Sequence, residues 1–277
     1  MFERMRQGWQ LTKKAWSVVR EHPRLVRLPF VGGLLALIAA LVIAGPGLWL
    51  ASSDVDSTTY AGYVLIAAGS YLASCIVIFY NVILAAAAND ALVGREPDVA
   101  AARRIAVSRI GTIAGWALVS AVVGVLLRVV RERFGAAGAI VSWIGAAAWG
   151  IVTFLVVPVL ALEGIGPIES VKRSGQLVRN RWGQQVTGNV VIGGVAAIAT
   201  FAGILIAVLG GVLLVSGATG SVAIGIVLIA VGIVVAIAAG VIAGATRGVF
   251  GVALYHFAAE EQAVGPFTTA ELAGAAS

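Results

Sequence analysis

Six long apolar stretches constrain what this 277-residue chain can fold into. A helix needs about 20 consecutive apolar residues to cross the hydrocarbon core of a bilayer, because it rises about 1.5 Å per residue. Each stretch meets that length: they cover residues 28–51, 60–93, 110–130, 138–162, 186–215 and 221–259. The sequence therefore predicts an all-α, polytopic transmembrane helix bundle. A single membrane domain is expected over residues 1–264, followed by a short cytoplasmic tail over residues 265–277.

The composition excludes most other classes of protein. Hydrophobic residues make up 60% of the chain and charged residues 12%, whereas soluble domains carry about 45–50% and about 25%. Disordered chains have the opposite bias. Cys75 is the single cysteine, so no internal disulfide, zinc cluster or other metal site is expected. With two histidines and no phosphate-binding loop, the sequence offers no catalytic template, and we expect neither enzymatic activity nor a cofactor.

The distribution of basic residues predicts the orientation of the spans. Most of the 19 lysines and arginines precede the first span, lie in the connections after the second and fourth spans, or fall late in the sixth. Only Arg128, Arg131 and Arg133 lie on the other side. Because cytoplasmic connections are enriched in Lys and Arg, both termini are predicted to be cytoplasmic, in a multi-pass protein of the cell membrane. The first apolar run lacks a small-residue cleavage site, so no signal peptide is expected.

Three basic segments are predicted to be amphipathic helices, at about residues 3–20, 98–109 and 167–182. In the third segment Ile168, Val171, Gly175 and Val178 recur at steps of three and four, which puts them on one helical face. The first segment repeats this spacing, and the second is a weaker copy. Helices of this kind lie in the membrane interface. The chain is thus predicted to repeat one unit three times, a surface helix followed by two spans.

The surface helices have two interpretations. In one, they anchor and orient the bundle. In the other, their basic residues bind anionic lipid headgroups or a regulatory partner, since each basic residue near an anionic leaflet contributes about 1 kcal/mol. The residues proposed for such a headgroup surface are Lys13, Lys14, Arg173, Arg179 and Arg181.

Small residues predict how the spans associate, because lipid is as apolar as leucine and helices attract one another in it through close packing. Gly240, Gly244 and Gly248 follow one another at steps of four in the sixth span, and Gly210-Gly211 lie in the fifth. These surfaces are expected to face neighbouring helices. Pro158 is expected to kink or end the fourth span.

Two segments carry a resemblance to known families. The surface-helix residues 166–174 with the run that leads into them, residues 157–163, and the segment Ala253-Leu254-Tyr255-His256-Phe257 resemble an uncharacterised prokaryotic family of six-span membrane proteins. More remotely, the repeat layout is similar to the membrane domain of some glycerophosphodiester phosphodiesterases. The resemblance implies a membrane domain without an assigned activity. The soluble phosphodiesterase barrel is absent, so hydrolysis is not implied.

Ionisable and amide residues inside spans are costly and are therefore candidate binding residues. The candidates are Arg247, Asp90, Glu163, Asn81 and His256. One interpretation makes Arg247, about 16 Å from the inner end of its helix by helical rise, the counter-ion of Asp90 or Glu163 in a polar cavity. The other places these groups at the headgroup boundary, where they are solvated.

Two functions follow from these features. The first is a non-enzymatic membrane protein that organises lipid or partner proteins at the cytoplasmic leaflet. The second is a small transporter or channel with a polar cavity around Arg247. The expected partners are membrane lipids with anionic headgroups, together with a second copy of the chain or another membrane protein. Nucleic acid is not expected despite a pI near 10.0, because the basic residues line up at one membrane face.

Overall fold

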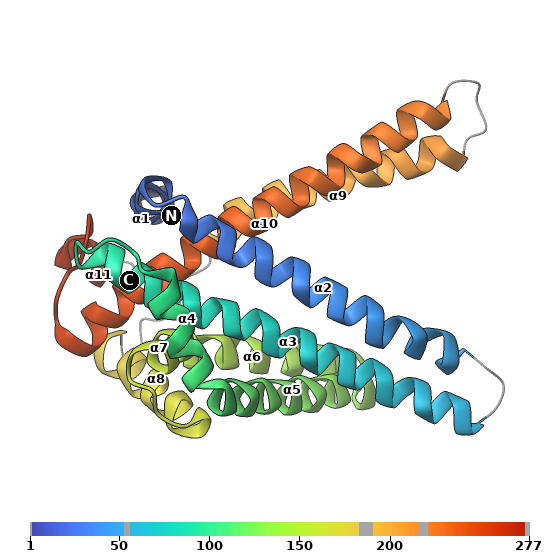
Figure 1. The fold of residues 1–277 in the computed structure, drawn as a ribbon, viewed down its shortest axis with the longest axis horizontal. Coiled ribbons are helices and arrows are strands. Elements are labelled where there is room, and N and C mark those ends of the chain that lie inside the picture. The colour runs from blue at the N-terminus through green and yellow to red at the C-terminus, as the bar shows by residue number, and fades with distance from the viewer. Residues whose placement is uncertain (1, 53–55, 183–190, 216–220, 275–277) are drawn as a thin grey trace.

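The structure is a computed structural model that describes residues 2–52, 56–182, 191–215 and 221–274; the side chains of residues 2–8, 181–182, 191–199, 221 and 274 lie outside this description. Over these residues the chain is all-helical (Figure 1). The helices are α1 (Phe2–Glu21), α2 (Arg24–Ala51), α3 (Asp56–Leu92), α4 (Val99–Ser108), α5 (Ile110–Arg133), α6 (Gly135–Val152), α7 (Val156–Leu162), α8 (Pro167–Trp182), α9 (Val191–Val215), α10 (Ser221–Glu260) and α11 (Thr269–Gly274).

The long helices form three hairpins, α2–α3, α5–α6 and α9–α10, each made of two helices in contact. The α5–α6 hairpin lies beside α3, whereas the α9–α10 hairpin diverges from the other two (Figure 1). The first and last described helices, α1 and α11, lie at the end where the hairpins converge.

Five helical segments are long and apolar enough to cross a membrane: Arg24–Ala51, Asp56–Leu92, Ile110–Arg133, Gly135–Leu162 and Val222–Glu260. They correspond to five of the six predicted spans. The remaining prediction, residues 186–215, falls partly outside the described residues, and its apolar segment Thr200–Val215 is shorter than a full crossing. The sixth span therefore stays a prediction, as does the threefold repeat.

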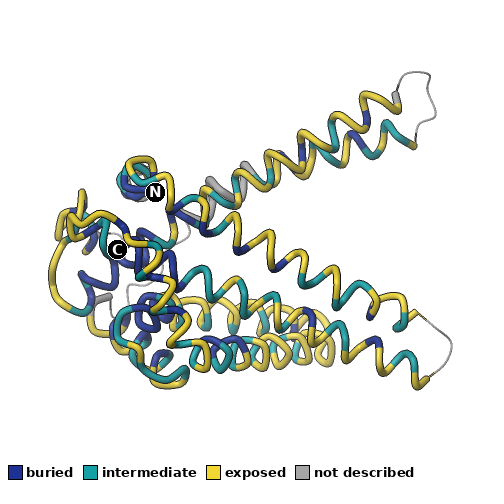
Figure 2. Tube along the Cα trace, viewed as in Figure 1, coloured by how far each residue is buried: buried dark blue, intermediate teal, exposed yellow. Residues whose placement is uncertain are grey.

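The hairpins expose apolar side chains to their surroundings. Leu41, Val42, Val208 and Val234 each have more than half of their surface exposed. Figure 2 shows that exposed residues dominate the outer parts of the hairpins, whereas buried residues gather where the hairpins converge. Such large exposed apolar surfaces are typical of helices that face lipid.

The buried end of the molecule is a side-chain core, which we call the collar. The collar comprises α1, α4, α7 with Leu155 directly before it, α8 and α11, together with residues 82–92 of α3 and 245–260 of α10. Phe250, Leu84, Leu155 and Leu272 are among its fully buried side chains. The collar also contains the stretch that follows Gly265: Phe267 is buried against Phe250. The predicted tail therefore contains a helix that packs into the core.

Pro158 interrupts the fourth predicted span. Helix α6 ends at Val152, three residues follow without regular helix, and α7 begins at Val156. A proline cannot donate to the carbonyl four residues earlier, and its ring clashes with that carbonyl, so the break falls just ahead of it, as predicted. The buried backbone N–H of Leu155 donates instead to the Ser174 hydroxyl of α8, at 3.1 Å.

Glycines bring the two helices of a hairpin into backbone contact. A Cβ added at Gly203 or Gly232 would come within 2.8 Å of backbone atoms on the facing helix, and the same holds for Gly210. By contrast, a Cβ at Gly240 would meet nothing within 4 Å. Among the described side chains, the predicted contact face on α10 is therefore not seen at Gly240. The tight contacts with α9 lie earlier in α10, at Gly225 and Gly232.

Helices α1, α4 and α8 occupy the three segments for which surface helices were predicted. Asp98 caps α4 by accepting a hydrogen bond from the Ala101 backbone N–H at 2.9 Å, and this bond lowers the pKa of the Asp98 carboxyl. Helix α8 buries Ser170, Ser174, Leu177 and Val178 in the collar. Ile168, on the predicted apolar face, is 55% exposed, so this face packs only in part against the protein. That these helices lie in the membrane interface remains a prediction.

Candidate binding site

Two predicted site residues lie where the helices pass from exposed to buried. On α10, exposed residues predominate before Gly244 and buried residues predominate after it. On α3, the fully buried run begins at Val82, directly after Asn81. Asn81 and Arg247 therefore lie at the junction between the hairpins and the collar.

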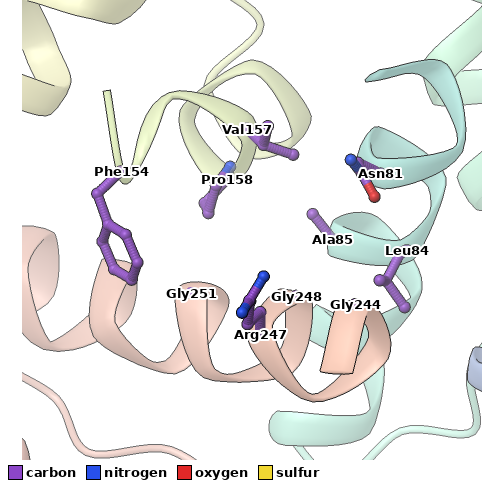
Figure 3. Close-up of a pocket in the computed structure, with 10 residues that line it drawn as sticks. All are labelled: Asn81, Leu84, Ala85, Phe154, Val157, Pro158, Gly244, Arg247, Gly248 and Gly251. Carbon is purple, nitrogen blue, oxygen red and sulfur yellow. The ribbon is translucent and has the colours of Figure 1, made fainter. Parts of the chain in front are cut away.

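A cavity of about 270 Å³ opens at this junction. Asn81 borders it from α3 and Arg247 from α10, while Phe154, Val157 and Pro158 line it from the interrupted span (Figure 3). The remaining lining residues are Leu84, Ala85, Gly244, Gly248 and Gly251. Only Asn81 and Arg247 contribute polar side chains to this lining, so the cavity combines one cation and one amide with apolar walls.

Glycines keep the α10 side of the cavity open. A Cβ at Gly251 would stand 3.7 Å from Cγ of Pro158, and a Cβ at Gly248 would come within 2.5 Å of a Leu84 methyl. Because these positions carry no side chain, Gly251 leaves space beside α7, and Gly248 lets Leu84 of α3 approach α10. Arg247 itself is exposed.

The predicted counter-ions of Arg247 have other partners. Asp90 accepts a hydrogen bond from Arg95 at 2.7 Å, and Glu163 accepts one from Nε of Arg173 at 2.9 Å. Among the described side chains, no carboxylate forms an ion pair with Arg247. The counter-ion interpretation is therefore wrong, and the cavity does not include Asp90, Glu163 or His256.

Glu163 belongs to a separate polar cluster inside the collar. Its carboxylate accepts from Arg173 of α8 and from the Tyr255 hydroxyl of α10, the latter at 3.0 Å. The cluster joins three elements at the end of α7, so it holds the interrupted span against α8 and α10. The sequence analysis named the segment around Tyr255, but it did not predict the contact between Tyr255 and Glu163.

His256 forms a second cluster and is only 8% exposed. Its Nε2 contacts Oδ1 of Asn89 at 2.6 Å, and its Nδ1 contacts Oε2 of Glu260 at 2.7 Å. These contacts connect the end of α3 to the end of α10. The neighbours Tyr255 and His256 thus bind α10 to two different parts of the collar.

The residues of the predicted headgroup surface fall into two groups, some exposed and others paired with carboxylates. Lys13 and Arg179 are exposed, and the Lys13 ammonium lies 5.5 Å from the Trp9 ring centre. Lys14 instead donates to Glu271 at 2.6 Å, and Arg173 is held by Glu163. The side chain of Arg181 lies outside the described residues.

Arg109 is a partly buried cation that the sequence did not single out as a site residue. Its guanidinium donates to the backbone carbonyl of Leu160 at the end of α7. Burial lowers the pKa of the Arg109 side chain. Its position between α4 and α5 was the signal that could have identified it, because a basic residue there must reach either water or a protein acceptor.

No group of three metal-ligating side chains occurs in the part of the chain that the structure describes. A family of unknown function, DUF6159, matches residues 60–265. The chain belongs to the DUF6159 family. No curated protein matches it.

The DUF6159 match covers the cavity residues Asn81 and Arg247 and the centres of both polar clusters, Glu163 and His256. It leaves out α1, α2 and α11, and with them Lys13 and Lys14. The family match agrees with the predicted membership of an uncharacterised family. The remote similarity to phosphodiesterase membrane domains stays a prediction.

Proposed function

We propose that this DUF6159 protein is a non-enzymatic membrane protein that organises lipid or partner proteins at the cytoplasmic leaflet. In this proposal the chain crosses the cell membrane six times, and both termini are cytoplasmic. The five long apolar helices support the membrane location. The backbone contacts between α9 and α10 support a sixth crossing, because they keep α9 beside α10.

The collar is the observation that carries this proposal. It is a side-chain core at one end of the hairpins, and several exposed basic residues surround it, among them Lys13, Arg20, Arg103, Lys172 and Arg179. A protein core beside a leaflet, with cations on its surface, suits the recruitment of anionic lipid. Exposed apolar residues such as Ile168 and Trp9 would enter the same interface.

The topology is tested by cysteine labelling in a Cys75→Ser background. Single cysteines replace Ser57 near the tip of the α2–α3 hairpin, Ser216 between α9 and α10, and Ala273 in α11. A membrane-impermeant maleimide should label the first two in intact cells and the third only after permeabilisation. Labelling of position 273 in intact cells, or protection of position 216, would contradict six crossings with cytoplasmic termini.

The lipid role is tested by extracting the protein with its surrounding lipid in polymer-bounded nanodiscs. The double variant Lys13→Glu, Arg179→Glu should reduce the share of anionic lipid recovered with the protein. Arg131→Glu with Arg133→Glu, at the far end of α5, is the matched control and should leave that share unchanged. Equal recovery from the first variant and wild type would refute headgroup recruitment by the collar.

The cavity favours a second candidate function, a small transporter or channel. A cation and an amide in a space of about 270 Å³ would form part of a solute path. Its polar lining is confined to one level, which favours binding over passage. Solute-dependent swelling of proteoliposomes, abolished by Arg247→Gln, would support transport in place of lipid organisation.

A further inference from the structure

We infer that the cavity between α3, α7 and α10 binds the phosphate of one phospholipid from the cytoplasmic leaflet, with Arg247 as the phosphate ligand and Asn81 as a second hydrogen-bonding group. The inference deepens the proposed function and rests on it, because a phospholipid reaches the cavity only if the hairpins span the bilayer.

The length of the hairpins places the cavity at the level of lipid phosphates. Asn81 lies 25 positions after Asp56, where α3 begins, and Arg247 lies 25 positions after Val222 on α10. At 1.5 Å per residue each stretch is about 38 Å long, somewhat more than the hydrocarbon core of about 30 Å. With the hairpin tips in the outer headgroup region, both residues lie at the inner one. Arg247 is then shallower than its distance from Glu260 suggested, because the collar takes up the end of α10.

Arg247 is available for a ligand. Its guanidinium has five N–H donors and no acceptor, and it forms no ion pair with a described carboxylate. Guanidinium groups match phosphate oxygens in a two-pronged geometry and are weakly hydrated, which favours arginine over lysine at such sites. The Asn81 amide across the cavity supplies two further donors.

The walls specify what is attached to the phosphate. Apart from Asn81 and Arg247, the lining is apolar or glycine, with Phe154, Val157 and Pro158 on one side. A soluble phosphate would leave these surfaces without a partner, whereas the glycerol and first acyl carbons of a lipid would cover them. The volume of about 270 Å³ is below that of most sites for drug-sized ligands. It therefore fits the headgroup end of a lipid, and the chains must extend into the bilayer.

The test measures lipid retention by the purified full-length protein with native mass spectrometry. Three probes separate the sources of the ligand: dioleoylphosphatidylglycerol, dioleoylglycerol, which has the same chains without phosphate, and glycerol 3-phosphate, which has no chains. Wild type should retain one phosphatidylglycerol per chain. Neither dioleoylglycerol nor millimolar glycerol 3-phosphate should displace it.

Arg247→Gln should weaken this retention about tenfold or more, because a charge-assisted contact is lost. Arg131→Gln is the matched control: it removes an exposed arginine at the far end of α5, away from the cavity, and should retain phosphatidylglycerol like wild type. Gly251→Val leaves Arg247 in place and fills the cavity beside Pro158, so it should weaken retention as well. Elution volume and unfolding temperature identify any variant that fails to fold.

Equal retention by Arg247→Gln and wild type would overturn the inference, as would equal binding of dioleoylglycerol. Displacement by glycerol 3-phosphate at the same concentration would mean a soluble anion and would overturn the lipid assignment. The cysteine labelling described above separates a failure of this inference from a failure of the proposed function. Labelling as expected, together with unchanged retention, removes this inference alone, whereas labelling on the wrong side removes the proposed function with it.

Discussion

Helices meet backbone to backbone in the α9–α10 hairpin, whereas in the collar they meet through side chains. Gly203, Gly210, Gly225 and Gly232 let the two backbones of the hairpin approach, and the outward residues remain exposed. The collar instead buries Phe250, Leu155 and Leu272 and joins its elements by ion pairs. The difference follows from the solvent: burial drives association where water is the alternative, and close contact drives it where lipid is.

Adjacent glycines provide the strongest test of this comparison. Gly210→Leu should separate α9 from α10, because a Cβ there would meet the Gly225 carbonyl oxygen at 2.6 Å. The expected loss of stability is about 3 kcal/mol or more, the size seen for overpacking with backbone strain. It is measured as the unfolding temperature in detergent.

Gly211→Leu is the matched control for this change, because a Cβ at Gly211 would meet nothing within 4 Å. It adds the same side chain to the same helix and should leave the unfolding temperature close to that of wild type. If both variants were equally unstable, backbone contact would not be what holds the hairpin together.

In the collar, truncation of a buried side chain should lower stability, because side-chain packing holds the helices together there. Leu272→Ala removes a fully buried side chain from α11, and core truncations of this kind cost about 2–5 kcal/mol. We expect the lower part of that range, because α11 is short and lies at the end of the chain. The readout is protease sensitivity of residues 265–277, with Ala273→Ser as an exposed control that should remain resistant.

The Glu163 cluster should contribute less, because Arg173 is 38% exposed. Glu163→Ala leaves the Arg173 guanidinium and the Tyr255 hydroxyl without their acceptor, which costs on the order of 1–2 kcal/mol. Tyr255→Phe removes one of these hydrogen bonds and should cost about half as much. Chemical denaturation of the purified protein measures both. A larger loss from Tyr255→Phe than from Glu163→Ala would contradict the central position of the carboxylate.

The weakest expected effect is a pH dependence of the tail. The hydrogen bond from Lys14 lowers the pKa of the Glu271 carboxyl below its ordinary value of 4.5. The ionised Glu271 carboxylate therefore stabilises the folded tail above pH 4.5, and this stabilisation is lost as the pH falls through the lower folded-state pKa of Glu271. A spin label at position 273 should become more mobile in that acidic range. Glu271→Gln should abolish the transition, and a transition that persisted would assign it to another group.

The sequence predicted the helices well, because apolar length and basic connections are local signals. The break before Pro158 was predictable for the same reason. The contact surfaces could not be predicted in this way. Gly240 and Gly232 look alike in sequence, yet of the two only Gly232 meets the backbone of α9 within the described residues. Which glycine lies inside a contact depends on how the hairpins diverge, and no local pattern encodes that.

Of the five candidate site residues, the structure brings two to one cavity and leaves Asp90, Glu163 and His256 outside it. Asn81 and Arg247 do border one cavity. Glu163 was predicted to pair with Arg247, whereas in the structure it pairs with Arg173, ten positions further along the chain. The sequence could not distinguish these partners. The turn between α7 and α8 determines which basic side chain comes within reach of the Glu163 carboxylate. The burial of Phe267 and Leu272 was also missed, since the residues around them have the composition of a polar tail.

The contact between α1 and the C-terminal helix bears on how the protein is synthesised. Lys14 and Glu271 are 257 positions apart in the chain. At translation rates of about 5–20 residues per second, α1 leaves the ribosome on the order of 13–50 s before its last partner exists. The contact of Lys14 with Glu271 can therefore form only after nearly the whole chain has been made, so the collar is completed last.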